Sequence, residues 1–532
     1  MNAKKIVNII NFVRAEDPRV EQSILYGTFQ KQVDLCRSYP MPYTFLMQYD
    51  AFVRPEYVRL LTENKDPNME IGVWVELAQE QVERVGIKWD GREGYKWDWH
   101  VHPGMLMGYG VPERKLLIDE LMNRFYEVFG YYPKSVGSWL LDSWSIAYMA
   151  ETYHIDAFII CKEQFGTDGY TLWGGYYNQA YFPSKKNMFV PAQTEQEQIN
   201  TPVIRMLGPD PIYQYDFGLD EDYGYSHCQH VMTIEPVWEC GQNPDWVDWY
   251  LHSTFEEEFL NMAYTQTGQE NPFTWERFGE GLIMQMEKLY DGYKSGRFEV
   301  LSMGETGRWF TNTFRMTPAT AMTALEDWKN EGKQTVWYNC KRYRANILSE
   351  KNGLLLRDLF LFDENYEDRY WKEIATGSSA VYDTLPIVDG YRWGGKGIRS
   401  GWHFVTCGTH EKANGKIVST ERLSENDLKV NVEINGAEAS FVFHEDSFTI
   451  NFGNTNTELL FLHNSLEDTE IKEITADSVT YCHNDMRYGF QTNGKLQKTE
   501  KGYLMTPESG ILKIDFFAEK RNCFENTKKD KQ

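Results

Sequence analysis

Short apolar runs alternate with longer amphipathic segments over roughly the first 300 residues of the chain. The runs are rich in β-branched and aromatic residues, which is typical of buried strands. We predict eight strands, at residues 5–12, 43–48, 69–75, 135–141, 157–161, 202–207, 230–236 and 298–303. Apolar positions at helical spacing predict helices at 21–37, 55–63, 112–129, 146–153, 245–265 and 275–295. This alternation predicts an α/β fold: a (β/α) barrel of seven or eight strands, regular or distorted.

The pattern changes near Arg315. After one more predicted helix at 318–330, short alternating runs separated by Asn, Gly, Asp and Ser occur at 335–338, 353–362, 403–407, 427–434, 439–443, 448–452, 459–462 and 511–517. Such runs are typical of an antiparallel β-sandwich. We therefore predict two domains, a catalytic barrel over 1–320 and a β-sandwich with a linking helix over 321–532.

The central stretch of the predicted barrel is residues 131–177, a strand–helix–strand unit with carboxylates just past both strands. Asp142 follows the first strand and Glu163 the second. A loop rich in Gly and aromatic residues comes next and contains Asp168 and Trp173. Because the loops after parallel strands converge on one rim, the chemistry of such folds is found there.

Polar residues follow most of the predicted strands, namely Asn11, Asp50, Glu76, Asp142, Glu163, Glu235 and Glu305. A cluster of carboxylates is what glycosidic cleavage requires, because one carboxyl group protonates the leaving oxygen while another attacks the sugar or activates water. Crowding also separates their pKa values. The alternative for each acid is a helix cap, an arginine partner or simple solvation.

Three of these acids are the predicted catalytic residues. Asp142 is the first choice because tryptophans flank it, although it could equally be the N-cap of the next helix. Glu235 is second and is followed by a stiff proline. Glu305 is third and lies between glycines, which allow a ligand to approach closely or merely make a turn.

The predicted substrate-binding residues combine the remaining acids with aromatic and amide groups. Aromatic residues make up 15% of the chain, with 17 Trp and 33 Tyr, and such side chains either fill cores or stack on sugar rings. We predict substrate contacts from Asn11, Asp50, Glu76, Trp99, His100, Trp139, Glu163, Asp168 and Trp173.

Two histidine patterns raise a metal alternative, His100-x-His102 and His227-x-x-His230. With Asp50 or Asp98 they could form a zinc site. Ordinary hydrogen-bonded histidines are the preferred interpretation, so we predict no metal and no cofactor. The motifs of dinucleotide-binding folds, P-loops, serine hydrolases and zincins do not occur in the sequence.

Charge and composition restrict the partners. The formal net charge is −24, which disfavours nucleic acid and anionic membranes. No apolar run reaches the length of a membrane span. The eight cysteines are scattered and the N-terminus lacks the apolar region of a signal peptide, so we predict a cytoplasmic protein without a disulfide framework. Removal of an export signal would make it secreted or periplasmic.

Residues 70–76, EIGVWVE, and the run 112–139 resemble polysaccharide deacetylases of the NodB type. The resemblance covers residues 5–180. The two metal-binding histidines of that family would fall at Trp74 and Ala78, and NIINFVRAEDP stands where the family has its TFDDG strand. The resemblance therefore implies a deacetylase-like barrel with a changed set of metal ligands.

A barrel followed by a β-sandwich is also similar to glycoside hydrolases of families 57 and 38, which cleave α-glycosides with retention, and to uncharacterised proteins of gut bacteria. Transferred by strand count, the family 57 nucleophile would fall at Asp142 and its acid at Glu235. We predict a glycoside hydrolase that acts on small glycans from the non-reducing end. The alternatives are a metal-dependent carbohydrate deacetylase and a non-catalytic carbohydrate-binding protein. Homo-oligomer formation is left open.

Overall fold

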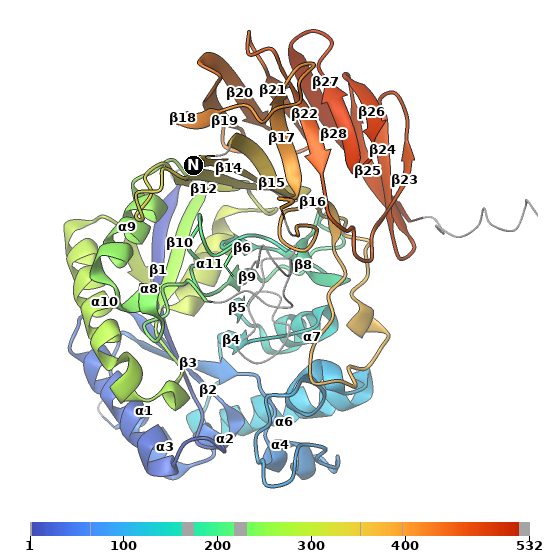
Figure 1. Cartoon of the computed structure of the whole chain (residues 1–532). Helices are drawn as coiled ribbons and strands as arrows, with labels where there is room; N and C mark the ends of the chain where they lie inside the picture. Colours follow the sequence, from blue (N-terminus) through green and yellow to red (C-terminus); the bar gives the residue numbers. More distant parts are fainter. Residues whose placement is uncertain are drawn as a thin grey trace, which may run out of the picture.

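The first half of the chain forms a curled sheet of mostly parallel strands (Figure 1). The structure is a computed structural model that describes residues 3–63, 65–161, 175–217, 231–351, 353–395 and 397–520. The strands of this sheet are β1 (Lys4–Val13), β2 (Tyr43–Met47), β3 (Met69–Trp74), β4 (Ser135–Ser138), β5 (Ala157–Ile160), β6 (Ala180–Tyr181), β9 (Val203–Arg205), β10 (Met262–Thr267) and β11 (Glu299–Leu301). Their order is β10-β1-β2-β3-β4-β5-β9-β6, with β11 also paired to β1. β7 (Pro183–Ser184) and β8 (Asn187–Pro191) form a separate ribbon.

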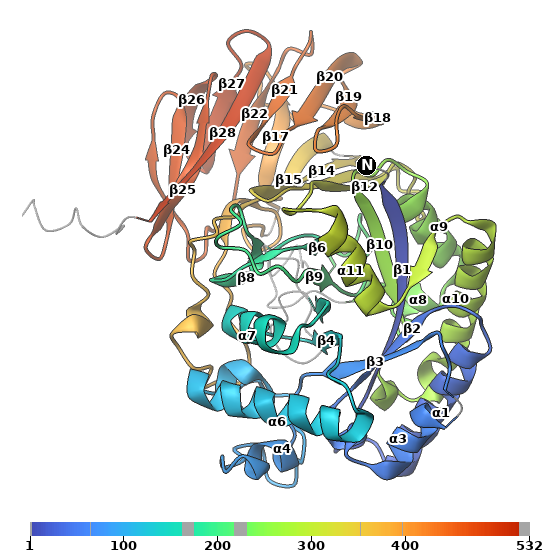
Figure 2. The same cartoon turned by 180° about the vertical axis from the view of Figure 1, so that it is seen from behind.

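Most of the long helices lie outside this sheet, and α11 lies within its curve (Figures 1 and 2). The helices are α1 (Gln22–Arg37), α2 (Tyr49–Phe52), α3 (Pro55–Thr62), α4 (Gln79–Arg84), α5 (Val101–Gly104), η1 (Leu106–Gly108), α6 (Val111–Phe129), α7 (Ser143–Tyr153), α8 (Glu239–Gln242), α9 (Pro244–Phe255), η2 (Asn271–Phe273), α10 (Trp275–Ser295) and α11 (Met303–Thr313).

Side chains of β1 alternate between the two faces of the sheet, as the two-residue period of a strand requires. Val7 and Ile9 pack outward against the helices, while Ile10 and Phe12 belong to the inner cluster. The same alternation places every second residue of the neighbouring strands inside the curve.

Two glycines make room for this interior. A Cβ at Gly72 would lie 2.8 Å from Leu46 Cδ2, and one at Gly137 would lie 2.4 Å from Leu46 Cδ1. The inward positions of β3 and β4 are therefore glycines because Leu46 fills the space in front of them. Further inside, Phe310 of α11 belongs to the inner cluster, and Thr306 accepts a hydrogen bond from Asn8 at 2.7 Å.

The second half of the chain contains two antiparallel sheets packed face to face around their own core. The first consists of β12 (Thr320–Ala324), β13 (Gln334–Asn339), β14 (Tyr343–Glu350), β15 (Gly353–Leu361), β16 (Leu385–Asp389), β17 (Gly401–Thr406), β22 (Thr457–Leu462), β26 (Lys495–Thr499) and β27 (Gly502–Thr506). The second consists of β18 (Gly415–Arg422), β19 (Leu428–Ile434), β20 (Ala437–Phe443), β21 (Ser447–Asn451), β23 (Glu470–Ile474), β24 (Ser478–His483), β25 (Met486–Thr492) and β28 (Ile511–Lys520).

A segment of the second half reaches the first (Figure 1). This segment, residues 362–384, connects β15 to β16, contains η3 (Arg369–Trp371), and is called the crossing loop below. Its carbonyl groups at Gly377 and Ser378 accept hydrogen bonds from residues 101–102, both at 3.1 Å. Its side chains Tyr370, Ala375 and Ala380 join the inner cluster of the curled sheet.

The mixed α/β class and the β-rich second half agree with the prediction, and three predicted elements are wrong. Residues 245–265 are not one helix, because α9 ends at Phe255 and β10 then pairs with β1. Residues 318–330 are not a linking helix, because Thr320–Ala324 forms β12, fully buried and paired to β13.

The third difference concerns the predicted strand at 230–236. Its described residues form only an isolated bridge between Thr233 and Pro209. Pro209 and Pro236 both lack an N–H group, which restricts a ladder at this position. The described strands consequently leave the sheet open, with β10 at one edge and β6, which pairs with β9, at the other.

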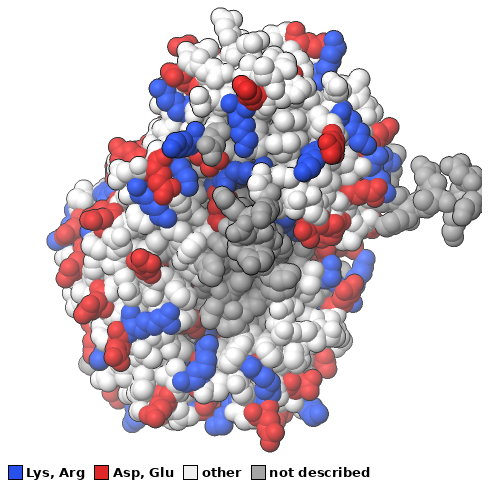
Figure 3. All heavy atoms as spheres, viewed as in Figure 1, with Lys and Arg blue, Asp and Glu red and all other residues white. Residues whose placement is uncertain are grey.

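Acidic and basic side chains are interspersed over the described surface in Figure 3. None of the helices in the described part of the chain combines the length and apolar composition that a membrane span requires. Cys36, Cys161, Cys240, Cys340 and Cys407 are free thiols. Cys482 is disulfide-bonded, which departs from the expectation of a chain without disulfides.

Candidate active site

Three aromatic rings form a layer across the inside of the curled sheet, near the C-terminal ends of its strands. Phe12 stacks on Trp74 with ring centroids 4.1 Å apart, and Trp139 meets both rings edge-on at 5.3 Å. The three residues occupy inward positions of β1, β3 and the extension of β4. The predicted substrate residue Trp139 therefore belongs to this layer.

A buried ion cluster lies one inward position further along the same strands. Arg14 Nη2 contacts Glu76 Oε2 at 2.9 Å and Glu270 Oε2 at 2.6 Å, and Arg14 Nη1 lies 3.8 Å from Asp17. Arg14 and Glu76 are each 2% exposed and Glu270 is 5% exposed. The ring of Trp97 covers the guanidinium at 3.8 Å. We call Arg14, Asp17, Glu76 and Glu270 the Arg14 cluster.

Strand register explains why these residues converge. Arg14 follows Phe12 on β1, Glu76 follows Trp74 on β3, and Glu270 follows β10, the strand paired to the other side of β1. Each lies an even number of residues beyond an inward-facing side chain, so it faces the same interior. The Trp74 indole N–H also donates to Glu76 Oε2 at 2.7 Å, which fixes that carboxylate.

The charges in the cluster compete with burial. Burial opposes the charge on Arg14, but the carboxylates of Glu76, Glu270 and Asp17 outweigh it and raise the pKa of Arg14. Burial raises the pKa of Glu76, and Arg14 offsets only part of that effect. Burial alone would raise the pKa of Asp17, yet Arg19 and Arg14 together lower it. Glu76 therefore tends to keep its proton, and it shares the cation of Arg14 with Glu270 and Asp17.

The carboxylates of Glu76 and Glu270 are close to each other. Both contact the same nitrogen, at 2.9 and 2.6 Å, so the two contacting oxygens are no more than 5.5 Å apart. Retaining glycosidases place their two carboxyl groups about 5–5.5 Å apart, a separation that this upper limit permits. Two carboxyl groups on one face of the site are therefore available for acid and nucleophile roles.

Asp142 occupies a different environment. It is the N-cap of α7, where it accepts hydrogen bonds from the backbone N–H of Ser145 at 2.9 Å and from the Ser145 hydroxyl at 2.6 Å. Its Oδ1 also lies 3.0 Å from Arg114 Nη1. This buried carboxylate caps α7 and pairs with Arg114. The helix-cap alternative for Asp142 therefore describes its contacts.

Glu235 lies between the ends of β9 and β10 and is 4% exposed. It accepts a hydrogen bond from the Thr233 hydroxyl at 2.9 Å. Trp238, three residues on, contacts Phe273 with ring centroids 5.9 Å apart, and the Phe273 N–H donates to the carbonyl group of Glu270. The loops that carry Glu235 and Glu270 are therefore neighbours.

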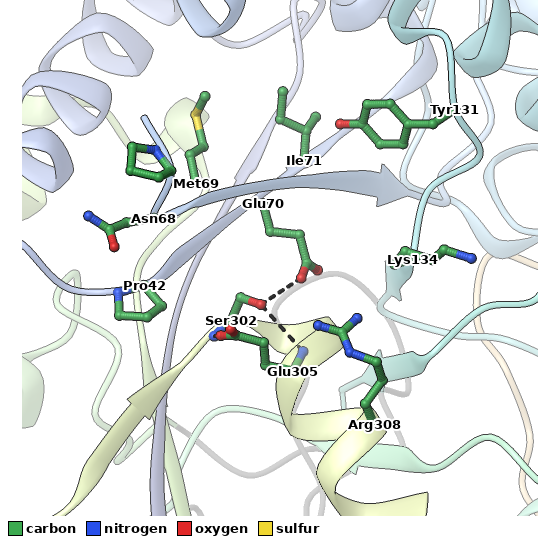
Figure 4. Close-up of a pocket in the computed structure, with 11 residues that line it drawn as sticks. Pro42, Asn68, Met69, Glu70, Ile71, Tyr131, Lys134, Ser302, Glu305 and Arg308 are labelled. Atoms are coloured by element: carbon green, nitrogen blue, oxygen red, sulfur yellow. Dashed lines mark hydrogen bonds between the residues drawn. The ribbon is translucent and has the colours of Figure 1, made fainter. Parts of the chain in front are cut away.

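Glu305 lies away from the Arg14 cluster, beside residues that precede β3 and β4 (Figure 4). It closes a capping box with Ser302 at the start of α11 and is exposed. A pocket of about 320 Å³ lies here. Its wall includes Glu70, which accepts hydrogen bonds from the Ser302 hydroxyl at 2.6 Å and from the Gly304 N–H at 3.1 Å.

Asn11 faces the outer side of the sheet, and Asp50 lies in α2, just past β2. The Asn11 amide oxygen accepts from Gln32 at 3.0 Å and from the Gln269 N–H at 3.1 Å. Asp50 Oδ2 accepts from the N–H groups of Ala15 and Glu16 at 2.9 and 2.6 Å, and burial raises the pKa of Asp50 to about 7. Both side chains hold the loops that follow β1 and β10.

Trp99 and His100 lie on the segment above the cluster. The guanidinium groups of Arg92 and Arg19 pack on Trp99 at 4.0 and 4.8 Å. His100 is the N-cap residue of α5, and its N–H donates to Asp98 at 3.1 Å. The predicted residues Glu163, Asp168 and Trp173 lie outside the described residues, as do His227 and His230.

Among solved structures, the chain is similar to that of a candidate glycoside hydrolase/deacetylase from Parabacteroides distasonis. The sequences are 15% identical, the TM-score is 0.50, and the match covers 68% of this chain and 86% of that one. The two chains therefore share a fold. This confirms the relationship in fold that the resemblance implied.

Two further similarities are lower. A candidate polysaccharide deacetylase from Mycobacterium smegmatis is 13% identical with a TM-score of 0.34, over 58% of this chain and 90% of that one. A family 57 branching enzyme from Thermococcus kodakaraensis is 9% identical with a TM-score of 0.29, over 58% and 72% of the two chains. No family model and no curated protein matches the chain.

The deacetylase side of this glycoside hydrolase/deacetylase fold implies a bound metal, so the available ligands matter. Within the described ranges, no group of three or more His, Cys, Asp and Glu side chains is arranged to hold a metal ion. His100 and His102 are neighbours, with ring centroids 6.1 Å apart, but Asp98 beside them is held by Arg92 at 2.7 Å. The described residues do not fit the metal set of that alternative.

Three members of the cluster, Arg14, Asp17 and Glu270, are not among the site residues that the sequence predicts. Glu270 escapes the prediction because the helix expected over 245–265 hides the strand before it. The sequence TQTGQE (265–270) contains the signal, an alternating run with two threonines that ends at Gly268 with an acid after it. For Arg14 the signal is that it continues the inward alternation of Ile10 and Phe12.

Proposed function

We propose that the protein is a carbohydrate-active hydrolase that cleaves glycosidic bonds at the Arg14 cluster. The observation that supports this most directly is the pair Glu76 and Glu270, whose oxygens contact one arginine nitrogen and lie at most 5.5 Å apart. The aromatic layer below them supports it too, because aromatic faces provide a floor for a sugar ring. The position at strand C-terminal ends is the usual one for catalysis in α/β barrels.

The roles follow from the environment of each carboxyl group. Glu270, 2.6 Å from Arg14, is held as the anion and serves as the nucleophile. Glu76, whose pKa is raised by burial, serves as the proton donor. The Glu270 oxygen bonds to the anomeric carbon as the glycosidic bond breaks, and the Glu76 proton goes to the leaving oxygen. Water, deprotonated by Glu76, then cleaves the resulting ester and frees Glu270.

The three acids predicted from the sequence take different parts in this proposal. Glu235 lies on the neighbouring loop and contributes a further carboxylate to the substrate site. Asp142 and Glu305 act as helix caps, which is what their hydrogen bonds support. The long segment over the cluster, which includes Trp97, favours a closed pocket. Such a pocket would accept small glycans that enter it by one end of the sugar chain.

The test compares the carboxylate pair with a glutamate at the other end of β3. Glu76→Gln and Glu270→Gln are compared with Glu70→Gln, which alters a part-buried inward carboxyl group at the opposite end of the sheet. Each protein is assayed against a panel of nitrophenyl glycosides and against acetylated chitooligosaccharides. Nitrophenol release and acetate release are measured separately and expressed per folded molecule.

We expect nitrophenol release from the wild type and from Glu70→Gln, and its loss in the other two variants. Acetate release without nitrophenol release would replace the glycosidase by the deacetylase alternative. Full turnover in both Glu76→Gln and Glu270→Gln would refute the assignment of the carboxylate pair. Binding of sugars without any turnover in the wild type would favour the non-catalytic alternative.

A further inference from the structure

Gln48 is a buried amide with no partner. Its side chain is 0% exposed, and neither Oε1 nor Nε2 has a hydrogen-bond partner. Buried amide groups are normally hydrogen-bonded, and leaving one unsatisfied is costly. An amide that is fully buried and unpaired therefore requires an explanation in terms of function.

The position of Gln48 places it beside the Arg14 cluster. Its backbone N–H donates to the Val13 carbonyl group at 2.9 Å and its backbone is extended, so it continues the pairing of β2 with β1. By that register it stands opposite Arg14. Leu46 and Thr44, two and four residues earlier, face the interior, so Gln48 faces it as well.

A second side chain at the cluster has an unpaired polar atom. The indole N–H of Trp97, whose ring covers Arg14, has no hydrogen-bond partner. Together with the amide of Gln48 it offers donors and an acceptor beside the cluster, all of them uncharged. Gln266 also has an unpaired Oε1, but it pairs in register with Asn8 and so lies on the other side of the aromatic layer.

The charges nearby indicate which ligands these groups would take. The guanidinium of Arg14 is shared by Glu76, Glu270 and Asp17, so it is not free to hold a ligand anion. An added carboxylate or phosphate would meet three acids at short range. An uncharged ring with several hydroxyl groups would instead find amide and indole partners and an aromatic floor.

We infer that the site takes a neutral sugar ring and that Gln48 determines this specificity by hydrogen-bonding one of its hydroxyl groups. The inference rests on the carbohydrate substrate proposed above, and not on which carboxylate acts as acid or nucleophile. It assigns Gln48 a role in binding that neither the fold nor the paired carboxylates require.

The experiment compares Gln48→Leu with Gln81→Leu. Gln81, on α4 in the helix layer, is also buried and has an unpaired Oε1, but its Nε2 donates to the Leu117 carbonyl group at 3.1 Å. Binding of glucose, galactose, mannose and N-acetylglucosamine, and of glucuronate and galacturonate, is measured by calorimetry for the full chain. Thermal unfolding of each variant is recorded without sugar.

We expect at least one neutral sugar to bind the wild type more tightly than either uronate. Gln48→Leu should weaken that binding roughly threefold to tenfold, as expected for one lost hydrogen bond. Its melting temperature should not fall, because leucine removes an unsatisfied amide. Gln81→Leu should bind sugar as the wild type does.

Several results would overturn the inference. These are tighter binding of a uronate, unchanged binding in Gln48→Leu, or no binding of any sugar in the panel. A marked loss of stability in Gln48→Leu would indicate a purely structural role. The proposed hydrolase fails by a different result, namely turnover that survives in both Glu76→Gln and Glu270→Gln, so the two failures are distinguishable.

Discussion

Glu70 and Glu76 lie six residues apart on the same inward face of β3 and its extension, and they have opposite surroundings. Burial raises the pKa of both. Glu70 is surrounded by donors, including the Ser302 hydroxyl at 2.6 Å and the Gly304 N–H at 3.1 Å at the start of α11. Glu76 shares Arg14 with two other acids.

The difference shows that burial and a raised pKa do not by themselves identify a reactive carboxylate. At the N-terminal end of the sheet, enough neutral donors are present to satisfy one acid, and the arrangement joins α11 to β3. At the C-terminal end, Glu76 and Glu270 contact the same nitrogen of Arg14, and Asp17 contacts both Arg14 and Arg19. Carboxylates that share one cation are the ones whose charges a substrate and a proton transfer can change.

The largest effect expected from this comparison is on catalysis. Glu76→Gln and Glu270→Gln should each lower kcat by about 10²–10⁴-fold, the range typical of a lost acid, base or nucleophile. Steady-state kinetics on a reactive aryl glycoside measures this. Azide added to Glu270→Gly should restore turnover and yield a glycosyl azide, whereas the same addition to Glu70→Gly should do nothing.

The second effect is on stability. Arg14→Met removes the cation that Glu76 and Glu270 contact, while Asp17 keeps its ion pair with Arg19. Breaking a buried ion pair in this way costs about 3–5 kcal/mol. Urea unfolding at neutral pH should reveal the loss. Lowering the pH should reduce this loss of stability, because a protonated carboxyl group carries no charge for a cation to compensate. An Arg14→Met protein as stable as the wild type at pH 7 would contradict the ion pairs described here.

Asp50 extends the comparison to a buried acid in α2, the helix that follows β2. Burial raises its pKa to about 7, against about 3.9 when unfolded. The folded state therefore keeps this proton up to a higher pH than the unfolded state does. The stabilisation that the protonated group contributes is fully present below pH ~4 and is lost as the pH rises to about 7. Asp50→Asn should remove that fall, by up to about 1.4 kcal/mol per pH unit. Melting temperatures of both proteins between pH 4 and 8 provide the test.

The smallest effect is expected at Glu70. Glu70→Gln keeps one acceptor oxygen and loses the other, so it should cost about 1–2 kcal/mol of folding stability. Its kcat should match that of the wild type. If Glu70→Gln abolished turnover while remaining folded, the two ends of the sheet would not differ in the way proposed.

Much of the fold could be predicted because its signals are local. β1, β2, β3, α6 and α10 follow from apolar period and end signals within a few residues of their observed bounds. β10 has a local signal in TQTGQE, but the helical spacing over 245–265 hides it, and its partner β1 is more than 250 positions away in the sequence. The helix predicted over 318–330 is wrong although β12 pairs with the nearby β13, because residues 318–330 carry helical spacing on their own.

The site could be predicted only in part. Glu76 was identified because it directly follows a strand. Asp142 and Glu305 satisfy the same rule, yet an acid after a strand is also the preferred cap of the next helix, and the sequence does not separate the two. Inward and outward parity would have separated Asn11 from Arg14, because Phe12 between them faces the interior.

The crossing loop has a consequence for how the protein can be divided. Residues 362–384 leave the second half of the chain and contribute Tyr370, Ala375 and Ala380 to the interior of the first. The backbone of residues 101–102, on the segment above the cluster, is tied to the same loop. A gene cut near codon 320 would therefore yield a barrel with an exposed apolar seam. Recombination could exchange the second half only together with a matching inner surface, so the two halves are expected to be inherited as one unit.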